Sequence, residues 1–343
     1  MSQIRYDLIH DDYALIAPER LHRPDCFKVA VASDSVDTSH CPFCPGHEGM
    51  TPPEIFAIRE SGKADTPGWK TRVVPNLYKA VQIEAPWQSR DEGPYRVWEG
   101  LGAHEVIIDT PRHLLRMDEW KNEEYRLWLK TLRARINDLR NDVRLVYIDV
   151  FKNQGRYAAA TQSHPHTQLI ALPTVPQRRL RDLQRAHEYF LTHRIGIHEA
   201  VLNEELRSDA RIVAQNDRFV CYSPYASTFA FETAITARDH AALSDLDDDA
   251  VASLASLMQE IVSRLYRVLG DFDFNILFNT PPMQKNSETA PFFDDIGRMW
   301  RLHIRILPRL FRMGGFELGS GAMINPVAPE EAARHLKEGR EGA

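Results

Sequence analysis

The chain has 343 residues and a formal net charge of −6, from 42 Lys and Arg against 48 Asp and Glu. Hydrophobic residues make up 43% and charged residues 26% of the sequence, a globular composition that excludes collagen-like, coiled-coil and wholly disordered chains. The net acidity argues against a general nucleic-acid binder, because such proteins gather Lys and Arg in a basic patch, and 4 Cys are too few for a disulfide scaffold at this length.

The N-terminal residues are polar, and no window of the sequence approaches the length of apolar residues that a membrane span needs. A secretory signal peptide would require an apolar stretch at the N-terminus. We therefore expect a cytoplasmic protein with no membrane partner and no nucleic-acid partner. In that compartment thiols stay reduced, and closely spaced Cys act as metal ligands or redox groups.

The first predicted elements lie in a Pro-rich stretch between Pro18 and Pro94, where short β-like runs occupy 72–75 and 80–83. Further along, apolar runs closed by turn residues predict strands. Apolar residues at helical spacing predict a helix with Asp118 at its N-cap. The elements expected here are strands at 105–109, 144–151 and 168–172 and a helix over 118–141.

The second half repeats this order after a charged helical stretch at 178–210. Its expected elements are strands at 218–223, 231–236, 273–278 and 302–307, a helix over 246–269 and a short helix over 329–338. Glu105 precedes His113 by eight residues, as Glu232 precedes His240. The halves are therefore predicted to be divergent copies of one α+β unit, 1–175 and 176–343, each a mostly antiparallel sheet with a packed helix.

The first motif with chemical meaning is Cys41-Pro-Phe-Cys44. Two thiolates at this spacing can bind one tetrahedral Zn²⁺, with the remaining ligands supplied from elsewhere in the chain. A redox role is less favoured, because Pro45-Gly46 follows where a redox motif would begin a helix. A chance pair of Cys in a turn is the third interpretation.

The second motif is His164-Pro-His166-Thr-Gln168. Residues two apart in a strand point to one face, so these three side chains would share a face at the end of a β run. Alternating His is common in metal sites. The other interpretation is nucleophilic catalysis, in which an imidazole attacks phosphorus to form a covalent intermediate while the amide holds a phosphoryl oxygen.

These motifs resemble those of the galactose-1-phosphate uridylyltransferases, a family of the histidine-triad superfamily of nucleotide-binding proteins. The resemblance runs from near Leu15 to near Leu336 and implies a fold of two tandem histidine-triad units, in agreement with the repeat. The motifs that carry it are Pro18-Glu-Arg20-Leu-His-Arg23-Pro24, Cys41-Pro-Phe-Cys44-Pro-Gly, Val74-Pro-Asn76, Thr110-Pro-Arg-His113, Asn153-Gln-Gly155, His164-Pro-His166-Thr-Gln168, and Leu307-Pro-Arg309 through Gly315-Phe-Glu317.

The resemblance implies a nucleotidyltransferase of carbohydrate metabolism. His166 matches the nucleophile that attacks the α-phosphate of a nucleotide-sugar and gives a nucleotidyl-histidine, which a sugar 1-phosphate then displaces. Gln168 matches the residue that holds the phosphoryl oxygen. The alternative is a nucleotide-sugar or dinucleoside-polyphosphate phosphorylase that uses the same His, and a further alternative is a non-catalytic nucleotide-binding protein. Because the nucleophile must be neutral, activity is expected to fall below about pH 6.

The same resemblance implies one structural zinc site and a substrate site. The zinc ligands would be Cys41, Cys44, His113 and His164, which form a closed Cys₂His₂ set. A homodimer is implied as well, in which the C-terminal segment reaches the active site of the partner. The substrate-binding positions are Arg20, Arg23, Asn76, Asn153, Gly155, Thr161 and Ser163, with Thr161 where a phosphate-contacting Ser is expected.

Some members of the family carry a second metal in the C-terminal half, and this chain departs from their pattern. Arg301 and Asn279 stand where His ligands are expected, so we expect no second metal. His303 is expected to be a hydrogen-bonded core or rim histidine. Arg301 and Arg305 share its strand face and would either bind an anion or form ion pairs. Phe311-Arg312 replaces a lysine-containing pattern, which leaves recognition of the hexose open.

The other His and Cys residues are expected to have no special role. His187, His193 and His198 fall in a charged helical stretch and should be solvated. Cys26 and Cys221 should be small buried hydrophobic residues.

Overall fold

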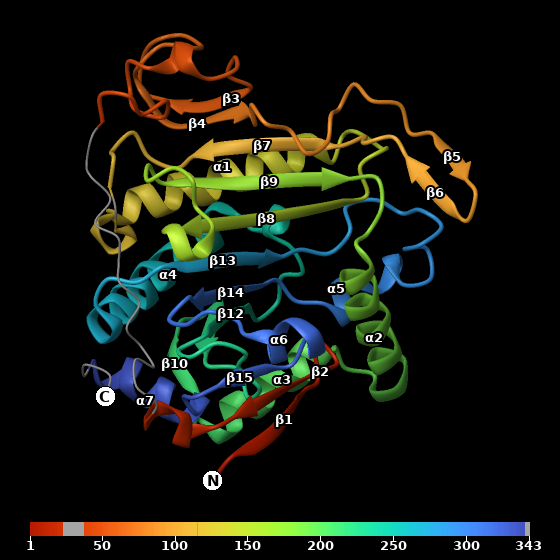
Figure 1. Cartoon of the computed structure of the whole chain (residues 1–343), viewed down its shortest axis with the longest axis vertical. Helices are drawn as coiled ribbons and strands as arrows, with labels where there is room; N and C mark the ends of the chain where they lie inside the picture. Colours follow the sequence, from red (N-terminus) through yellow and green to blue (C-terminus); the bar gives the residue numbers. More distant parts are fainter. Residues whose placement is uncertain (23–37, 115, 340–343) are drawn as a thin grey trace.

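A computed structural model of the chain describes residues 1–22, 38–114 and 116–339. Its main element is a ten-stranded sheet in which every neighbouring pair is antiparallel, with the order β10-β11-β12-β14-β13-β8-β9-β7-β4-β3 (Figure 1). The predicted α+β class with an antiparallel sheet is confirmed. In the same order, the strands span Ile212–Gln215, Phe219–Tyr222, Thr233–Ala237, His303–Pro308, Phe274–Asn279, Tyr147–Gln154, His166–Leu172, Ala103–Ile108, Trp69–Pro75 and Phe56–Arg59.

Two similar runs of strands meet between β8 and β13. Outward from this pair, β8-β9-β7-β4-β3 and β13-β14-β12-β11-β10 have the same order, and each run carries one long helix between its third and fourth strands in the chain. The helices are α1 (Asn122–Leu139) and α4 (Asp248–Leu269). This topology is the repeat that the sequence predicts. Because both runs belong to one sheet, the division at residues 175 and 176 stays a prediction.

The strand register shifts the alignment of the two copies by one residue. His166 of β9 pairs with Ile108 of β7, and His303 of β14 pairs with Thr236 of β12. Four residues before these partners lie His104 and Glu232, so Glu232 corresponds to His104 and not to Glu105. The side chains agree with this shift: Glu105 reaches Arg135 of α1 at 2.7 Å, whereas Glu232 binds Arg305 of β14 at 2.6 Å. Successive strand residues point to opposite faces, so the two glutamates are not equivalent.

Both long helices lie behind the sheet in Figure 1 and pack against each other. One hydrophobic core lies between them and the sheet, and it contains residues from both runs, including Trp128 of α1 and Phe278 of β13, whose rings are 5.6 Å apart. The predicted N-cap of α1 is wrong. Residues 117–119 form a separate 3-10 turn, and Lys121 is the residue that precedes the helix.

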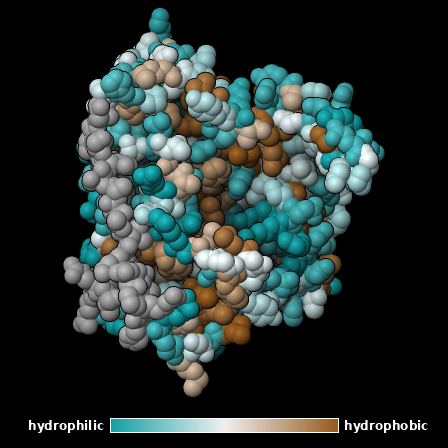
Figure 2. All heavy atoms as spheres, in the orientation of Figure 1, coloured by the Kyte–Doolittle hydropathy of each residue, from teal (hydrophilic) through white to brown (hydrophobic). Residues whose placement is uncertain are grey.

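The other face of the sheet is covered unevenly. Over β10 to β12 it packs against α3 (Ile197–Ser208), which follows α2 (Gln177–His193). The charged helical stretch predicted at 178–210 therefore consists of two helices, and Arg194 takes a left-handed conformation with φ 60° between them. Over β9 and β7 no helix of the described residues covers this face. Figure 2 shows hydrophobic residues along its middle and hydrophilic residues at its margins.

The remaining elements are short. A three-stranded sheet joins the two ends of the chain, because β15 pairs in parallel with β2, and a two-stranded hairpin of β5 and β6 projects from the body (Figure 1). The run at 80–83 forms only an isolated bridge and not the expected strand. No helix among the described residues is long and apolar enough to cross a membrane. These elements are β1 (Gln3–Asp7), β2 (Asp12–Ile16), β5 (Ser89–Glu92), β6 (Tyr95–Trp98), α5 (Ile296–Met299), α6 (Gly315–Ser320), β15 (Met323–Asn325) and α7 (Pro329–Glu338).

Candidate active site

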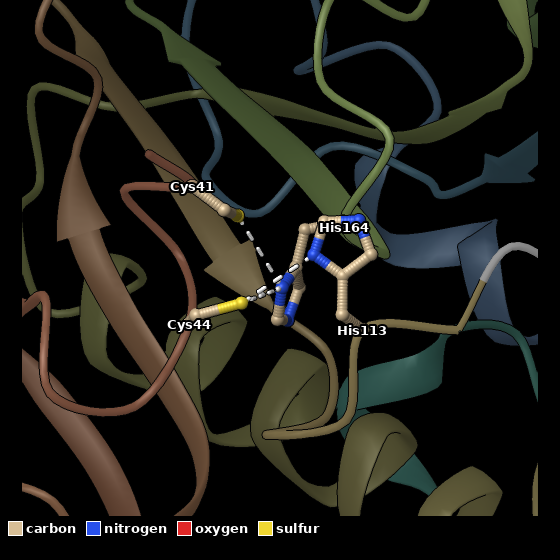
Figure 3. A group of neighbouring side chains, drawn as sticks. All are labelled: Cys41, Cys44, His113 and His164. Atoms are coloured by element: carbon tan, nitrogen blue, oxygen red, sulfur yellow. Dashed lines mark hydrogen bonds between the residues drawn. The ribbon is translucent and has the colours of Figure 1, made fainter. Parts of the chain in front are cut away.

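Two cysteines and two histidines from three separate segments converge next to the start of β9 (Figure 3). Cys41 and Cys44 lie in a turn, His113 follows β7, and His164 directly precedes β9. Their ligand atoms all lie within 4.8 Å of one another. The Nδ1 atom of His164 is 3.5 Å from the Cys44 Sγ and 3.6 Å from the Cys41 Sγ. The structure thus brings together the four predicted metal ligands.

The partners of the two imidazoles leave Nδ1 free to bind a metal. His164 Nε2 donates to the carbonyl oxygen of Thr110 at 2.9 Å, and His113 Nε2 lies 3.1 Å from the Ser163 hydroxyl. Such contacts on the far ring nitrogen are usual for histidines that bind metals. Burial and the neighbouring Cys41 raise the pKa of the Cys44 thiol to about 12, so a thiolate here requires a cation. The four donors therefore fit a metal ion that prefers tetrahedral sulfur and nitrogen ligands.

His166, the predicted nucleophile, is the first residue of β9 and is 6% exposed. Its Nδ1 lies 2.9 Å from the carbonyl oxygen of His164. A carbonyl oxygen only accepts, so Nδ1 carries the hydrogen and Nε2 carries the lone pair. Burial and the charge of Lys152 lower the pKa of His166 to about 4. The imidazole is therefore neutral well below pH 6, where the sequence alone placed the limit.

Lys152 lies beneath the nucleophile on β8 and is fully buried. Its ammonium group donates to Asp109 at 2.8 Å and to the carbonyl oxygen of His166 at 3.2 Å. Asp109 is also 0% exposed. This ion pair connects the ends of β7, β8 and β9, and sequence reasoning did not single it out.

Gln168 lies two residues beyond His166 on the same strand face. Its Oε1 atom is 3.0 Å from His104 Nε2 and 3.5 Å from Asn76 Nδ2. Two predicted site residues, Asn76 and Gln168, are therefore neighbours. His104 was missed, because it lies outside the motifs and the strand expected at 105–109 began two residues later than β7, which left His104 outside it.

Asn153 and Gly155 lie at the end of β8, on the side of His166 away from β7. The Asn153 Oδ1 accepts from the Asn275 amide of β13 at 2.8 Å. Gly155 has a φ of 82°, and a Cβ atom on it would lie 1.8 Å from the Asp273 carboxylate. Only glycine therefore allows Asp273 to bind the Tyr157 N–H, at 2.6 Å, and fix the turn after β8.

The other predicted substrate residues have different surroundings. Arg20 is exposed in a 3-10 turn at 18–22, which follows β2 at the far end of the molecule from β9 (Figure 1). Thr161 is exposed in the loop before β9. Ser163 instead contacts the metal-ligand group through His113. Arg23 lies outside the described residues.

The polar residues of the second half are largely paired with each other. Arg301 binds Glu199 at 2.8 Å, and Arg305 binds Glu232, so the expected alternative of ion pairs holds in place of anion binding. His303 is buried, and its Nδ1 lies 3.2 Å from the carbonyl oxygen of Arg301, as expected for a hydrogen-bonded core histidine.

The expectation of a solvated His198 is wrong. This residue is 1% exposed, with its ring 4.4 Å from that of Trp300, because α3 lies directly on the sheet. His193 is exposed, and His187 lies 3.3 Å from Asp295. Cys221 is buried as expected, and Cys26 lies outside the described residues.

Comparison with known proteins agrees with this geometry. The family described as Galactose-1-phosphate uridyl transferase, N-terminal domain, matches residues 1–176. An ADP-glucose phosphorylase of Arabidopsis thaliana is 32% identical over 98% of this chain and 92% of its own length. A galactose-1-phosphate uridylyltransferase of Thermotoga maritima is 24% identical over 98% of both chains.

The fold comparison gives the same relationship. A crystal structure of an ADP-glucose phosphorylase from Arabidopsis thaliana with bound ADP-glucose superposes with a TM-score of 0.80 at 28% identity, over 98% of this chain and 99% of that one. The predicted resemblance is therefore confirmed by sequence and by fold. With a family match across its first half and a 32% identical relative along nearly all of its length, this protein belongs to the galactose-1-phosphate uridylyltransferase family.

Proposed function

We propose that this chain is a nucleotidyltransferase that works through a covalent intermediate on His166. The Nε2 lone pair attacks the α-phosphorus of a nucleoside-diphosphate sugar, and the bond from this phosphorus to the bridging oxygen breaks. The sugar 1-phosphate leaves with that oxygen and its electron pair. An acceptor phosphate oxygen then attacks the same phosphorus and releases the imidazole. The observation that carries this proposal is the hydrogen bond from Nδ1 to the His164 carbonyl, which leaves Nε2 as the nucleophilic atom.

The surroundings of His166 suit this step. Phosphoryl transfer depends on positioning and on stabilising charge at the phosphoryl oxygens. The Gln168 amide lies on the same strand face and can donate to one of these oxygens. The pKa of His166, lowered by burial and by Lys152, keeps the nucleophile unprotonated at neutral pH. We assign Asn76, Asn153, Gly155 and Thr161 to the substrate site on the strength of the resemblance.

Inorganic phosphate is the second candidate acceptor. The relative that is 32% identical along nearly the whole chain is an ADP-glucose phosphorylase. In addition, Arg309 donates to the Asn275 side chain at 3.0 Å, and Asn275 in turn binds Asn153. Arg309 forms no ion pair within the described residues, so its charge is available to an anionic group. A phosphorylase reaction would use the same first step and differ only in what displaces the nucleotide.

We propose that the Cys₂His₂ group holds one structural zinc ion. When bound, zinc would cross-link the 41–44 turn to the segment that leads into β9. His164 would be a ligand through Nδ1, while its carbonyl oxygen accepts the hydrogen bond from His166. The metal would therefore orient the nucleophile through the backbone and take no part in the chemistry. We expect no second metal.

We further propose a cytoplasmic homodimer. Arg20 is exposed in the 3-10 turn that follows β2, so we propose that it reaches the nucleotide across a subunit interface. The segment after β14 is the other candidate for such a contact. In its own chain, Arg312 of this segment lies over the Tyr157 ring at 5.1 Å, beside the turn after β8.

The decisive experiment is a labelling assay combined with an acceptor panel. The purified protein is incubated with UDP-glucose or ADP-glucose labelled at the α-phosphate, and the expected product is an acid-labile, base-stable phosphohistidine. The variant His166→Gly should take no label yet keep its circular dichroism spectrum, whereas His193→Ala, which changes an exposed histidine, should label normally. Absence of label with every nucleotide-sugar would refute an enzymatic role.

The labelled protein also identifies the acceptor. Discharge of the label by glucose 1-phosphate or galactose 1-phosphate would identify a transferase. Discharge by inorganic phosphate, with release of a nucleoside diphosphate, would identify a phosphorylase. The nucleotide that labels fastest identifies the base.

A further inference from the structure

We propose that His104 is a positioning residue that fixes the Gln168 amide with its NH₂ group turned toward the phosphoryl group on His166. This inference rests on the proposed function. It concerns a residue outside the motifs that carry the resemblance.

The tautomer of His104 follows from its backbone contact. The Ala80 N–H donates to His104 Nδ1 at 3.1 Å. A backbone N–H can only donate, so Nδ1 must carry the lone pair, and the hydrogen of the neutral ring lies on Nε2. Because the loop after β4 supplies this N–H, only one tautomer of the ring fits, in which Nδ1 accepts and Nε2 donates.

The orientation of the Gln168 amide follows from the tautomer. His104 Nε2 lies 3.0 Å from Gln168 Oε1 and donates to it. The oxygen and nitrogen of a glutamine amide are assigned from such contacts. Asn76 lies beside this contact: its Oδ1 accepts the Tyr78 N–H at 2.9 Å, so its NH₂ group faces both His104 Nε2, at 3.0 Å, and the Gln168 oxygen, at 3.5 Å. Because the Ala80 N–H occupies Nδ1, the His104 hydrogen stays on Nε2, and the Gln168 oxygen is the acceptor that both donors can share. With Oε1 held from this side, the Gln168 NH₂ group is left to donate elsewhere.

This orientation matters for the chemistry. A phosphoryl oxygen gains charge as the bond to the leaving group breaks, and a donor already aimed at it stabilises that charge. If the Gln168 amide were free to rotate, Oε1 would face the phosphoryl oxygen part of the time and repel it. His104 therefore acts through Gln168 and does not itself need to touch substrate.

The second half of the chain supports the same pairing of positions. By strand register, Glu232 is the equivalent of His104 and Arg305 is the equivalent of Gln168. Glu232 binds Arg305 at 2.6 Å. The residue types differ completely, yet the side chain at the first position holds the side chain at the second in both runs of the sheet. The fold thus places the side chain at position 104 within hydrogen-bonding distance of the side chain at position 168.

The kinetic test compares His104→Ala with matched controls in the first half-reaction. Single-turnover labelling of His166 should slow about tenfold in His104→Ala, with the KM for the nucleotide-sugar changed less than about twofold. His104→Gln places an amide NH₂ near the same oxygen and should recover most of the rate. His193→Ala, on the exposed surface of α2, should match the wild type.

A double variant separates positioning from a general structural effect. If His104 acts through Gln168, then His104→Ala should have no further effect on a protein that already carries Gln168→Ala. A rate in His104→Ala equal to the wild type would overturn the proposal, and so would effects of the two substitutions that multiply. Loss of the circular dichroism spectrum in His104→Ala would shift the comparison to His104→Gln, for which a rate as low as that of Gln168→Ala would also overturn it.

A spectroscopic measurement keeps this inference independent of activity. Nitrogen-15 NMR of the folded protein at neutral pH should show His104 protonated at Nε2 and not at Nδ1. The Gln168 side-chain amide signals should shift in His104→Ala and stay in place in His193→Ala. If the wild type takes no label, the proposed function fails, while this spectrum still decides the orientation. Protonation at Nδ1, or unmoved Gln168 signals, would refute the role of His104.

Discussion

His164 connects the metal-ligand group to the nucleophile through two of its own atoms. Its Nδ1 faces the thiols of Cys41 and Cys44, while its carbonyl oxygen accepts the hydrogen bond that orients His166. The imidazole is itself held by the Thr110 carbonyl. Substitution of a thiol is therefore expected to disturb the orientation of His166 through His164, although no thiol takes part in the reaction.

Cys41→Ser should remove both metal and activity. We expect zinc to fall from about one ion per chain to well below it and the free energy of unfolding to fall by several kcal/mol, because binding energy of a structural metal is folding energy. Labelling of His166 should fall in parallel. Metal analysis, urea denaturation and the labelling assay check this. Cys221→Ala removes a buried thiol far from the group and should keep its zinc, and a Cys41→Ser protein with full zinc content would contradict the assignment.

Motifs in the sequence predicted the central residues of the site, but not the residues that support them. The pairing of the four metal ligands and the placement of His166 beside Gln168 follow from the resemblance. His104 and Lys152 were missed, because they belong to no motif and act only through contacts across neighbouring strands. Contacts of this kind depend on which residues of neighbouring strands pair, and this register could not be predicted from the sequence to within one residue.

Among the secondary-structure elements, those with strong periodicity were predicted and those that depend on distant partners were not. Eight of the ten strands of the large sheet and the two long helices lie within a few residues of their expected positions, because each buries a regular apolar pattern against one core. The two edge strands, β3 and β10, were not predicted. In contrast, β15 pairs with β2 from the other end of the chain. The end of α2 at Arg194 was not predicted either, and at Gly196, just before α3, a Cβ atom would lie 2.7 Å from the Arg298 carbonyl oxygen.

The buried ion pair of Lys152 and Asp109 stabilises the packing of β7, β8 and β9 against each other. Lys152→Met should lower the free energy of unfolding by about 3–5 kcal/mol, because it leaves the Asp109 charge buried without a partner. Adding Asp109→Asn should recover most of this loss. Urea denaturation of the single and double variants measures both. Lys130→Met breaks an exposed pair with Asp248 and should cost much less. An equally small cost for Lys152→Met would contradict the argument.

On the scale of the whole molecule, buried imidazoles lie where three distant parts of the chain meet. His198 of α3 lies 4.6 Å from His303 of β14, ring to ring, and His10 of the N-terminal segment lies 6.0 Å from His303. Burial lowers the pKa of His198 to about 3 and the pKa of His303 well below its usual value. These contacts attach α3 and the β1–β2 hairpin to the second run of strands, and burial favours the neutral rings of His198 and His303.

This arrangement makes the stability of the fold depend on pH in a defined direction. In the unfolded chain a histidine takes up its proton near pH 6.5, whereas His198 in the folded chain stays neutral to about pH 3. The unfolded state therefore binds more protons between these values, and stability must fall as the pH drops below about 6.5. At pH 5.5 the loss is about 1.4 kcal/mol for each such histidine. Urea denaturation from pH 7.5 to 5.5 should show His198→Leu losing about 1.4 kcal/mol less than the wild type. His193→Leu, at an exposed position, should follow the wild-type slope, and an identical slope for all three proteins would show that His198 is not neutral in the fold.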